Sequence, residues 1–181
     1  MTTLTATAGF APNSEASNPA IAVIGLGNLL MSDDGIGPLV CRELSKEMSD
    51  ADVEYIDGGV CGLSLLEWIE GREQVIIIDA ARMGCQPGEV VRFQPSDVRE
   101  AIERPDAGRI THATGVLDVL RFGLALGSVP PVTFYGIEPE SAEPGTELTA
   151  AGCRALSKAV ELVRVHIDEL ITRMRVSRAE V

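Results

Sequence analysis

The sequence is poor in basic residues, and this shortage limits the partners that it can bind. Its 181 residues include 15 Lys and Arg against 27 Asp and Glu, which gives a formal net charge of -12. A surface of this charge repels the phosphate backbone of a nucleic acid and the headgroups of an anionic membrane. We therefore expect neither nucleic acid nor a membrane as a partner.

Long apolar runs and paired cysteines are also absent. No apolar run approaches the roughly 18 residues that a membrane-spanning helix needs. Residues 1–19 contain no Lys or Arg and no continuous apolar stretch, so they do not resemble a secretory signal and are expected to be a disordered leader. Four scattered cysteines without a CxxC pair favour reduced thiols in a cytoplasmic protein over a disulfide framework or a zinc site. They are Cys41, Cys61, Cys85 and Cys153.

The sequence does contain an alternation of short apolar strands and amphipathic helices. Strands are predicted at residues 21–25, 53–56, 75–78, 89–93 and 132–137, and helices at 36–49, 63–69, 95–103, from 112 onward and 149–174. The run at 75–78 has no polar alternation, which is typical of a central strand in a parallel sheet, whereas 89–93 is expected at an edge. This pattern predicts an α/β protein with a three-layer α/β/α sandwich. We expect one domain over residues 20–176 and a flexible tail at 177–181.

The stretch Ile21–Gly37, IAVIGLGNLLMSDDGIG, combines a buried strand, a glycine turn, an acidic loop and the start of a helix. Ser32, Asp33 or Asp34 is expected to cap that helix, because short polar side chains satisfy the free N–H groups of a first turn. The order of these parts predicts that the acidic loop lies at the carboxyl end of the first strand.

Four candidate ligands follow predicted strands or begin a helix: Asp34, Asp57, Asp79 and His112. Because ligands bind outside the carboxyl ends of parallel strands, these residues are expected at one edge of the sheet. Two of these carboxylates with the imidazole would suit nickel or zinc with open coordination positions. The alternative is a set of caps and turns, which explains Asp79 least well because a carboxylate at the rim of the core needs a partner. The other histidine, His166, is expected to be solvated on the last helix.

Two other chemistries match the sequence less well. Gly25 and Gly27 begin a dinucleotide-binding fingerprint, but Leu30 stands where the third glycine belongs. Cys61 with His112 and a carboxylate would form a thiol hydrolase, although a cysteine in a glycine-rich loop is more often structural. The sequence contains no GxSxG and no HExxH motif.

The segments GLGNLLMSDDGIG, YIDGG, VIIIDA, THATG and GIEPES, in this order, closely resemble the nickel–iron hydrogenase maturation endopeptidases. The similarity runs from about residue 21 to the last helix. It implies an α/β/α fold with a twisted, mostly parallel five-stranded sheet. It also implies an activity, the removal of a C-terminal peptide from the hydrogenase large-subunit precursor once nickel has been inserted.

The resemblance also implies roles for single residues. The metal-contacting positions of the family correspond to Asp34, Asp79 and His112, and the nickel belongs to the substrate as a recognition element instead of being a permanent cofactor. Asp57 is a candidate accessory acid or base. Ala113 departs from the family, since many members have Gln there. A non-catalytic nickel-binding chaperone for the same precursor is the alternative function.

Overall fold

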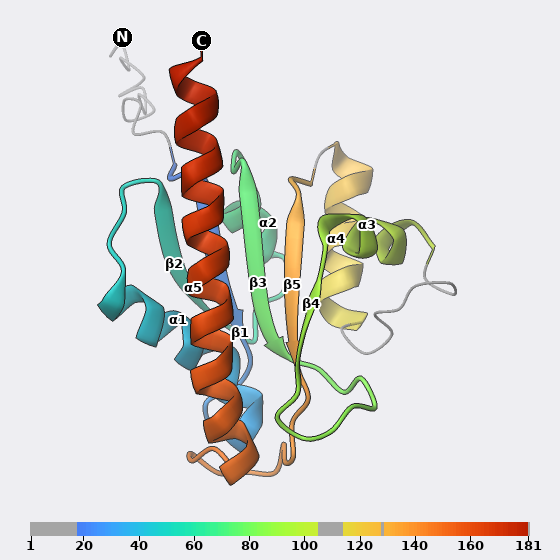
Figure 1. Cartoon of the computed structure of the whole chain (residues 1–181). Coiled ribbons are helices and arrows are strands. Elements are labelled where there is room, and N and C mark those ends of the chain that lie inside the picture. Colours follow the sequence, from blue (N-terminus) through green and yellow to red (C-terminus); the bar gives the residue numbers. More distant parts are fainter. Residues whose placement is uncertain (1–17, 105–113, 128, 181) are drawn as a thin grey trace, which may run out of the picture.

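A five-stranded sheet forms the centre of the computed structural model, which describes residues 18–104, 114–127 and 129–180 (Figure 1). The strands are β1 (Ile21–Leu26), β2 (Val53–Gly59), β3 (Gln74–Ala80), β4 (Val90–Phe93) and β5 (Val132–Ile137). Their order across the sheet is β2-β1-β3-β5-β4. Neighbouring strands are parallel except for β4, which is antiparallel to β5 at the edge. The mostly parallel sheet and the edge position of β4 confirm the prediction.

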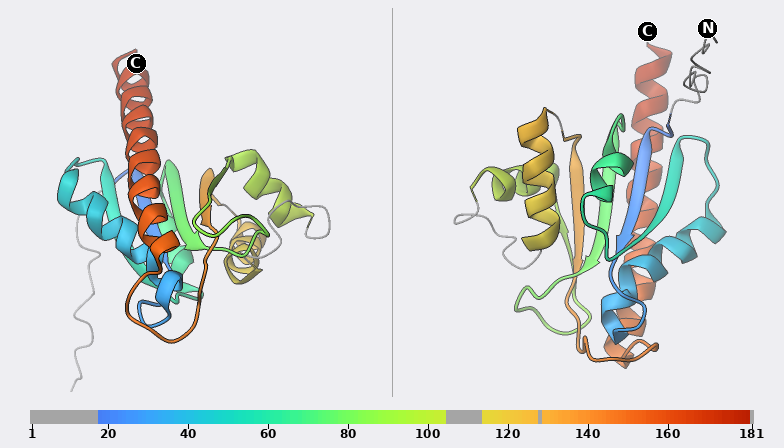
Figure 2. Two further views of the ribbon diagram at one scale, coloured as in Figure 1. Left: turned by 60° about the horizontal axis from the view of Figure 1, so that its bottom comes forward. Right: turned by 180° about the vertical axis from the view of Figure 1, so that it is seen from behind.

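Helices cover both faces of this sheet. They are the one-turn helix η1 (Ser32–Gly35) and the helices α1 (Ile36–Glu47), α2 (Ser64–Ile69), α3 (Pro95–Glu103), α4 (Thr114–Leu126) and α5 (Ala150–Ala179). One core cluster joins α1 and α5 to the sheet, and a second joins α2, α3 and α4 to its other face (Figures 1 and 2). The three-layer sandwich is therefore confirmed. Among the helices of the described residues, none is both long and apolar enough to cross a membrane.

Strand β3 supplies apolar side chains to both cores. Ile76 and Ile78 belong to the cluster under α1 and α5, while Val75 and Ile77 belong to the cluster under α2, α3 and α4. All four are at most 1% exposed. Burial on both faces explains why the strand has no polar alternation. The next residue, Asp79, is thereby held at the carboxyl edge of the sheet by a well-packed strand.

Glycines allow α1 to begin directly against the ends of β1 and β3. A Cβ atom on Gly37 would lie 2.2 Å from the carbonyl oxygen of Leu26 and 2.4 Å from that of Ile78. A Cβ atom on Gly25 would lie 2.2 Å from the carbonyl oxygen of Gly37. Any larger residue would push the helix away from the sheet, so these glycines place η1 over the carboxyl edge.

The capping prediction for α1 is wrong. The N-cap residue is Gly35, and no side chain caps the helix. The reason is that Ser32, Asp33 and Asp34 form the separate turn η1, which precedes α1 and directs these side chains elsewhere. The two carboxylates are consequently available for other contacts.

The last helix is longer than predicted, and ion pairs hold its end. It continues to Ala179, past the predicted tail boundary at residue 176, and the ion pairs Arg175–Asp50 (2.7 Å) and Arg178–Asp52 (2.9 Å) join its end to the α1–β2 loop.

His166 is only 4% exposed, so its prediction as a solvated residue is wrong. It lies three residues after Val163 and four before Leu170, and therefore belongs to the buried stripe of α5. Its ring centroid is 6.0 Å from that of Tyr135 on β5. Burial, helped by the positive charges of Arg92 and Arg173, lowers the pKa of His166 to about 4 and keeps the ring neutral.

We predict that Gly37→Ala lowers the free energy of unfolding by about 2–3 kcal/mol, because the added methyl group overlaps two carbonyl oxygens. Gly115→Ala is the matched control, since Gly115 is also the second residue of a helix but its Cβ would meet no atom of the described residues within 4 Å. We expect this control to be neutral or slightly stabilising. Urea unfolding of both variants measures the difference, and equal effects would contradict the close-contact argument.

Candidate functional site

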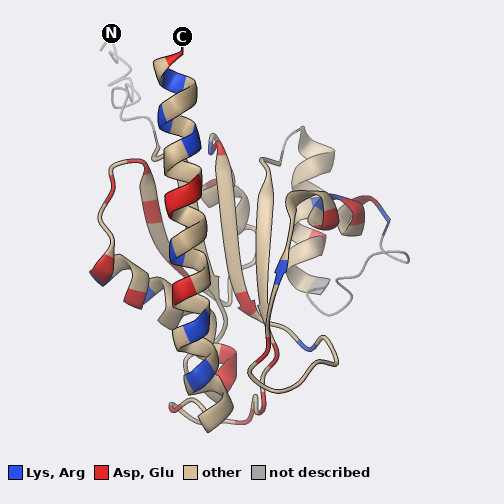
Figure 3. Ribbon diagram, in the orientation of Figure 1, with Lys and Arg blue, Asp and Glu red and all other residues tan. Residues whose placement is uncertain are grey.

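Two of the four predicted ligands come together at the carboxyl edge of the sheet, where acidic residues gather (Figure 3). Asp34 lies in η1 after β1, and Asp79 is the penultimate residue of β3. Burial, together with the negative charge of Asp34, raises the pKa of Asp79 to about 7. Asp34 is therefore close enough for its negative charge to disfavour the ionised form of Asp79, and a bound cation would relieve this repulsion.

The carboxylate of Asp34 is held by the loop that follows β1. The N–H of Asn28 donates to Asp34 Oδ2 at 2.8 Å, and the Asn28 side chain accepts from the N–H of Leu30 at 3.0 Å. Gly27 has a φ of +127°, and a Cβ there would lie 1.8 Å from the carbonyl oxygen of Asp34. Only glycine fits between the loop and η1, so the GLGN motif fixes the orientation of this carboxylate.

Asp33 has a structural role that the sequence analysis missed. It is 1% exposed, and its carboxylate accepts from the N–H groups of Glu140 (2.9 Å), Ser141 (3.3 Å) and Thr149 (2.8 Å) and from the Thr149 hydroxyl (2.8 Å). Burial by itself would raise the pKa of Asp33, but these hydrogen bonds outweigh it and the pKa is lowered. Asp33 thus anchors the 138–149 loop beside η1.

Glu138 anchors a second loop at this edge. It is 7% exposed, and its Oε2 accepts from the N–H groups of Met83 at 2.6 Å and Cys85 at 3.1 Å. This contact shapes the connection that leaves β3 directly after Asp79. In the GIEPES segment, the first acidic residue is therefore a support for the loop next to the candidate site.

Asp57 is not brought to the other two carboxylates. It lies within β2 opposite Gly25, and its carboxylate is ion-paired with Arg42 of α1 at 2.8 Å. Its side chain therefore projects to the face covered by α1. Asp79 alternates with Ile78 and projects to the opposite face, like Ile77.

His112 lies outside the described residues, and α4 begins two positions later at Thr114. Within the part of the chain that the structure describes, no three His, Cys, Asp or Glu side chains form a group that could hold a metal ion. Asp34 and Asp79 offer two oxygen ligands of the kind that a divalent cation accepts.

Cys61 is a free thiol, as are the other three cysteines. Burial raises the pKa of Cys61, and the negative charge of Asp79 raises it further. A thiol in such surroundings is held in its neutral form and is a weak nucleophile. The structure therefore argues against a thiol hydrolase. It also argues against a dinucleotide site, because the Asn28 N–H that a phosphate would use already donates to Asp34.

A family model described as hydrogenase maturation protease matches residues 38–166, which is well over half of the chain. The chain belongs to this family. It is 31% identical to the hydrogenase 2 maturation protease of Escherichia coli K12 over 82% of this chain and 91% of that protein. The solved structure of the hydrogenase maturating endopeptidase HybD from E. coli superposes with a TM-score of 0.70 at 30% identity, covering 82% of this chain and 92% of that one.

Other members of the hydrogenase maturation protease family are longer. The chain is 29% identical to the hydrogenase expression/formation protein HupD of Thiocapsa roseopersicina over 68% of its own length, but the match spans only 56% of that relative. The likeness to HybD, which covers 82% of this chain, confirms the fold class.

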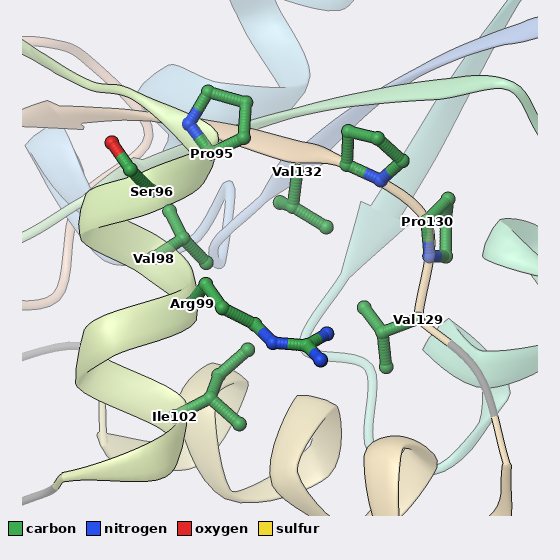
Figure 4. Close-up of a pocket in the computed structure, with 9 residues that line it drawn as sticks. Pro95, Ser96, Val98, Arg99, Ile102, Val129, Pro130 and Val132 are labelled. Carbon is green, nitrogen blue, oxygen red and sulfur yellow. The ribbon is translucent and has the colours of Figure 1, made fainter.

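A pocket of about 350 Å³ lies away from the candidate site, between α3 and the segment that leads into β5. Pro95, Val98 and Pro130 are among the residues that line it, and the side chain of Arg99 reaches across it (Figure 4). Since β5 begins here, this pocket is at the end of the sheet opposite to Asp34 and Asp79. It does not mark the site of this maturation protease.

We predict that Asp33→Asn destabilises the protein by about 2–4 kcal/mol, because an amide group would face backbone N–H donors in a buried position. Asp34→Asn is the matched control and should cost less than about 1 kcal/mol, since its amide oxygen still accepts from Asn28. Denaturant unfolding at pH 7 tests the pair. Similar losses of stability in both variants would show that Asp33 is not the anchor.

Asp79 should also make stability depend on pH. Its pKa is about 7 in the folded protein against an ordinary 3.8, so the native state binds a proton that the unfolded state has lost over this interval. Wild-type stability therefore falls as the pH rises from about 4 to 7. We predict that Asp79→Asn removes this loss. The free energy of unfolding of the variant minus that of the wild type should therefore be roughly 2–3 kcal/mol larger at pH 8 than at pH 5. Parallel stability profiles for the two proteins between pH 5 and 8 would contradict it.

Proposed function

We propose that this maturation protease is an endopeptidase that removes the C-terminal extension of a nickel–iron hydrogenase large-subunit precursor after nickel insertion. The observation that carries the proposal is the pair Asp34 and Asp79, two mutually repelling carboxylates held at one edge of the sheet. The printed names of the hydrogenase 2 maturation protease and of HybD support the reaction class. Four free thiols are consistent with work in the cytoplasm.

In this proposal the nickel arrives with the substrate. Asp34, Asp79 and His112 occupy open coordination positions of the ion, and this contact places the C-terminal segment of the precursor against the site. Two carboxylates and an imidazole suit a borderline divalent cation. Holding the segment in place supplies much of the rate increase, because a positioned reaction avoids the entropy cost of an encounter.

The environment of Asp79 supports a second task. Its pKa of about 7 in the absence of a cation allows it to hold or release a proton near neutral pH, which is the range suited to general acid–base catalysis. Binding a cation requires the ionised form, so cation affinity should rise as the pH passes through this value. The ion pair with Arg42 gives no support for Asp57 as the accessory acid or base.

We predict that Asp79→Asn and Asp79→Ala each reduce cleavage of nickel-loaded precursor by at least about 100-fold while the proteins stay folded. The amide retains the shape of the side chain but loses the charge that attracts the cation. Asp57→Asn is the matched control, an acidic residue on a neighbouring strand, and should cleave at nearly the wild-type rate. Mass spectrometry of the precursor and its product measures the reaction, and circular dichroism checks the fold.

Wild-type cleavage by folded Asp79→Asn would remove this residue from the site and overturn the proposal. Binding of the nickel-loaded precursor by the wild type without any product would favour the non-catalytic chaperone instead. Elemental analysis of untagged protein should find little metal. Stoichiometric zinc that resists chelators would contradict the proposal that nickel arrives with the substrate, and would indicate a resident hydrolytic zinc ion instead.

A further inference from the structure

Three exposed apolar side chains lie on two neighbouring loops at the carboxyl edge of the sheet. Leu30, on the 27–31 loop, is 65% exposed, and Val60 and Leu63, on the 59–63 loop, are 78% and 62% exposed. The two loops are joined by a hydrogen bond from the N–H of Gly27 to the carbonyl oxygen of Gly59 at 2.9 Å. Single exposed apolar residues are common, but three on two short adjoining loops are a feature to be explained.

Both loops border the carboxylate pair. The 27–31 loop contains Asn28, whose N–H donates to Asp34. The 59–63 loop contains Cys61, which packs against the core cluster of Ile77, on the same face of the sheet as Asp79. A polypeptide held at the two carboxylates would therefore pass beside these apolar side chains.

The 138–149 loop contacts the backbone beside Leu30 and adds negative charge to this edge. The N–H of Gly145 donates to the carbonyl oxygen of Leu30 at 2.9 Å, and the N–H of Ser32 donates to that of Gly145 at 2.8 Å. Three exposed acidic side chains lie on this loop, Glu140, Glu143 and Glu147. They would repel an acidic segment but not a neutral or basic one.

We propose that Leu30, Val60 and Leu63 form a docking ridge for an apolar, non-acidic segment of the precursor next to the bond that is cut. This inference rests on the proposed function and deepens it by naming the chemistry of the bound segment. Three observations together indicate this occupant: the apolar exposure on the two loops, their position beside the carboxylate pair, and the acidic neighbouring loop. The ridge contributes to binding of the precursor, while the carboxylates contact the nickel and contribute to cleavage of the peptide bond.

The test compares two triple variants of the full chain. The ridge variant carries Leu30→Ser, Val60→Ser and Leu63→Ser, and the control carries Leu126→Ser, Val165→Ser and Val176→Ser, which are exposed on α4 and α5. With nickel-loaded precursor, we expect the ridge variant to raise KM at least about tenfold with kcat within about twofold of the wild type, because the apolar area buried on binding is lost. The control should match the wild type in both constants.

A second pair of variants tests the charge of the segment. Val60→Lys should raise KM at least as much as Val60→Asp does, because both changes remove the apolar contact and an added carboxylate does not repel a neutral or basic segment. Tighter binding to Val60→Lys than to the wild type would mean an acidic segment and would overturn the proposal.

The outcomes separate this inference from the proposed function. Cleavage by the wild type with an unchanged KM in the folded ridge variant overturns the ridge alone, as does an equal rise of KM in the control. If the ridge variant does not fold, the single change Val60→Ser, at the most exposed of the three positions, takes its place and should raise KM about threefold. Absence of any cleavage by the wild type overturns the proposed function, and the ridge falls with it.

Discussion

The close contact between α1 and the ends of β1 and β3 is the constraint on which the rest of the edge depends. Gly25 and Gly37 allow backbone to lie against backbone where any side chain would collide with a carbonyl oxygen. This contact places η1 over the end of β3, and Asp34 then shares its surroundings with Asp79. Packing therefore imposes the repulsion between the carboxylates. A cation that binds there would relieve this repulsion, and its binding free energy would be more favourable by that amount.

Two adjacent acids divide the work at this edge. Asp33 is surrounded by donors, stays ionised and joins the 138–149 loop to η1. Asp34 accepts one backbone N–H and remains partly exposed. The same residue type thus serves structure at one position and candidate chemistry at the next, because one side chain points into the protein and the other toward the edge.

The periodicity of the apolar residues predicts the architecture, because the run at 75–78 indicates a central strand with Asp79 at its end. Predictions of burial fail where contacts between distant segments decide the environment of a residue. Whether Asp33 or Asp34 would be buried depends on the 138–149 loop, which lies more than a hundred residues away in the sequence. The prediction for His166 is wrong because it treats an imidazole as polar, although the spacing from Val163 and Leu170 puts this residue on the buried stripe. The prediction for Asp57 uses its position after a strand but not the face of the sheet to which its side chain points.

The hydrogen bonds of Asp33 to Thr149 span 116 residues of sequence. In a chain that folds during synthesis, such a contact cannot form before Thr149 has emerged. The loop that borders Asp34 is fixed only when the start of α5 has docked, so a partly synthesised chain on the ribosome lacks this edge of the site. The order of synthesis therefore delays completion of the site until most of the protein has emerged.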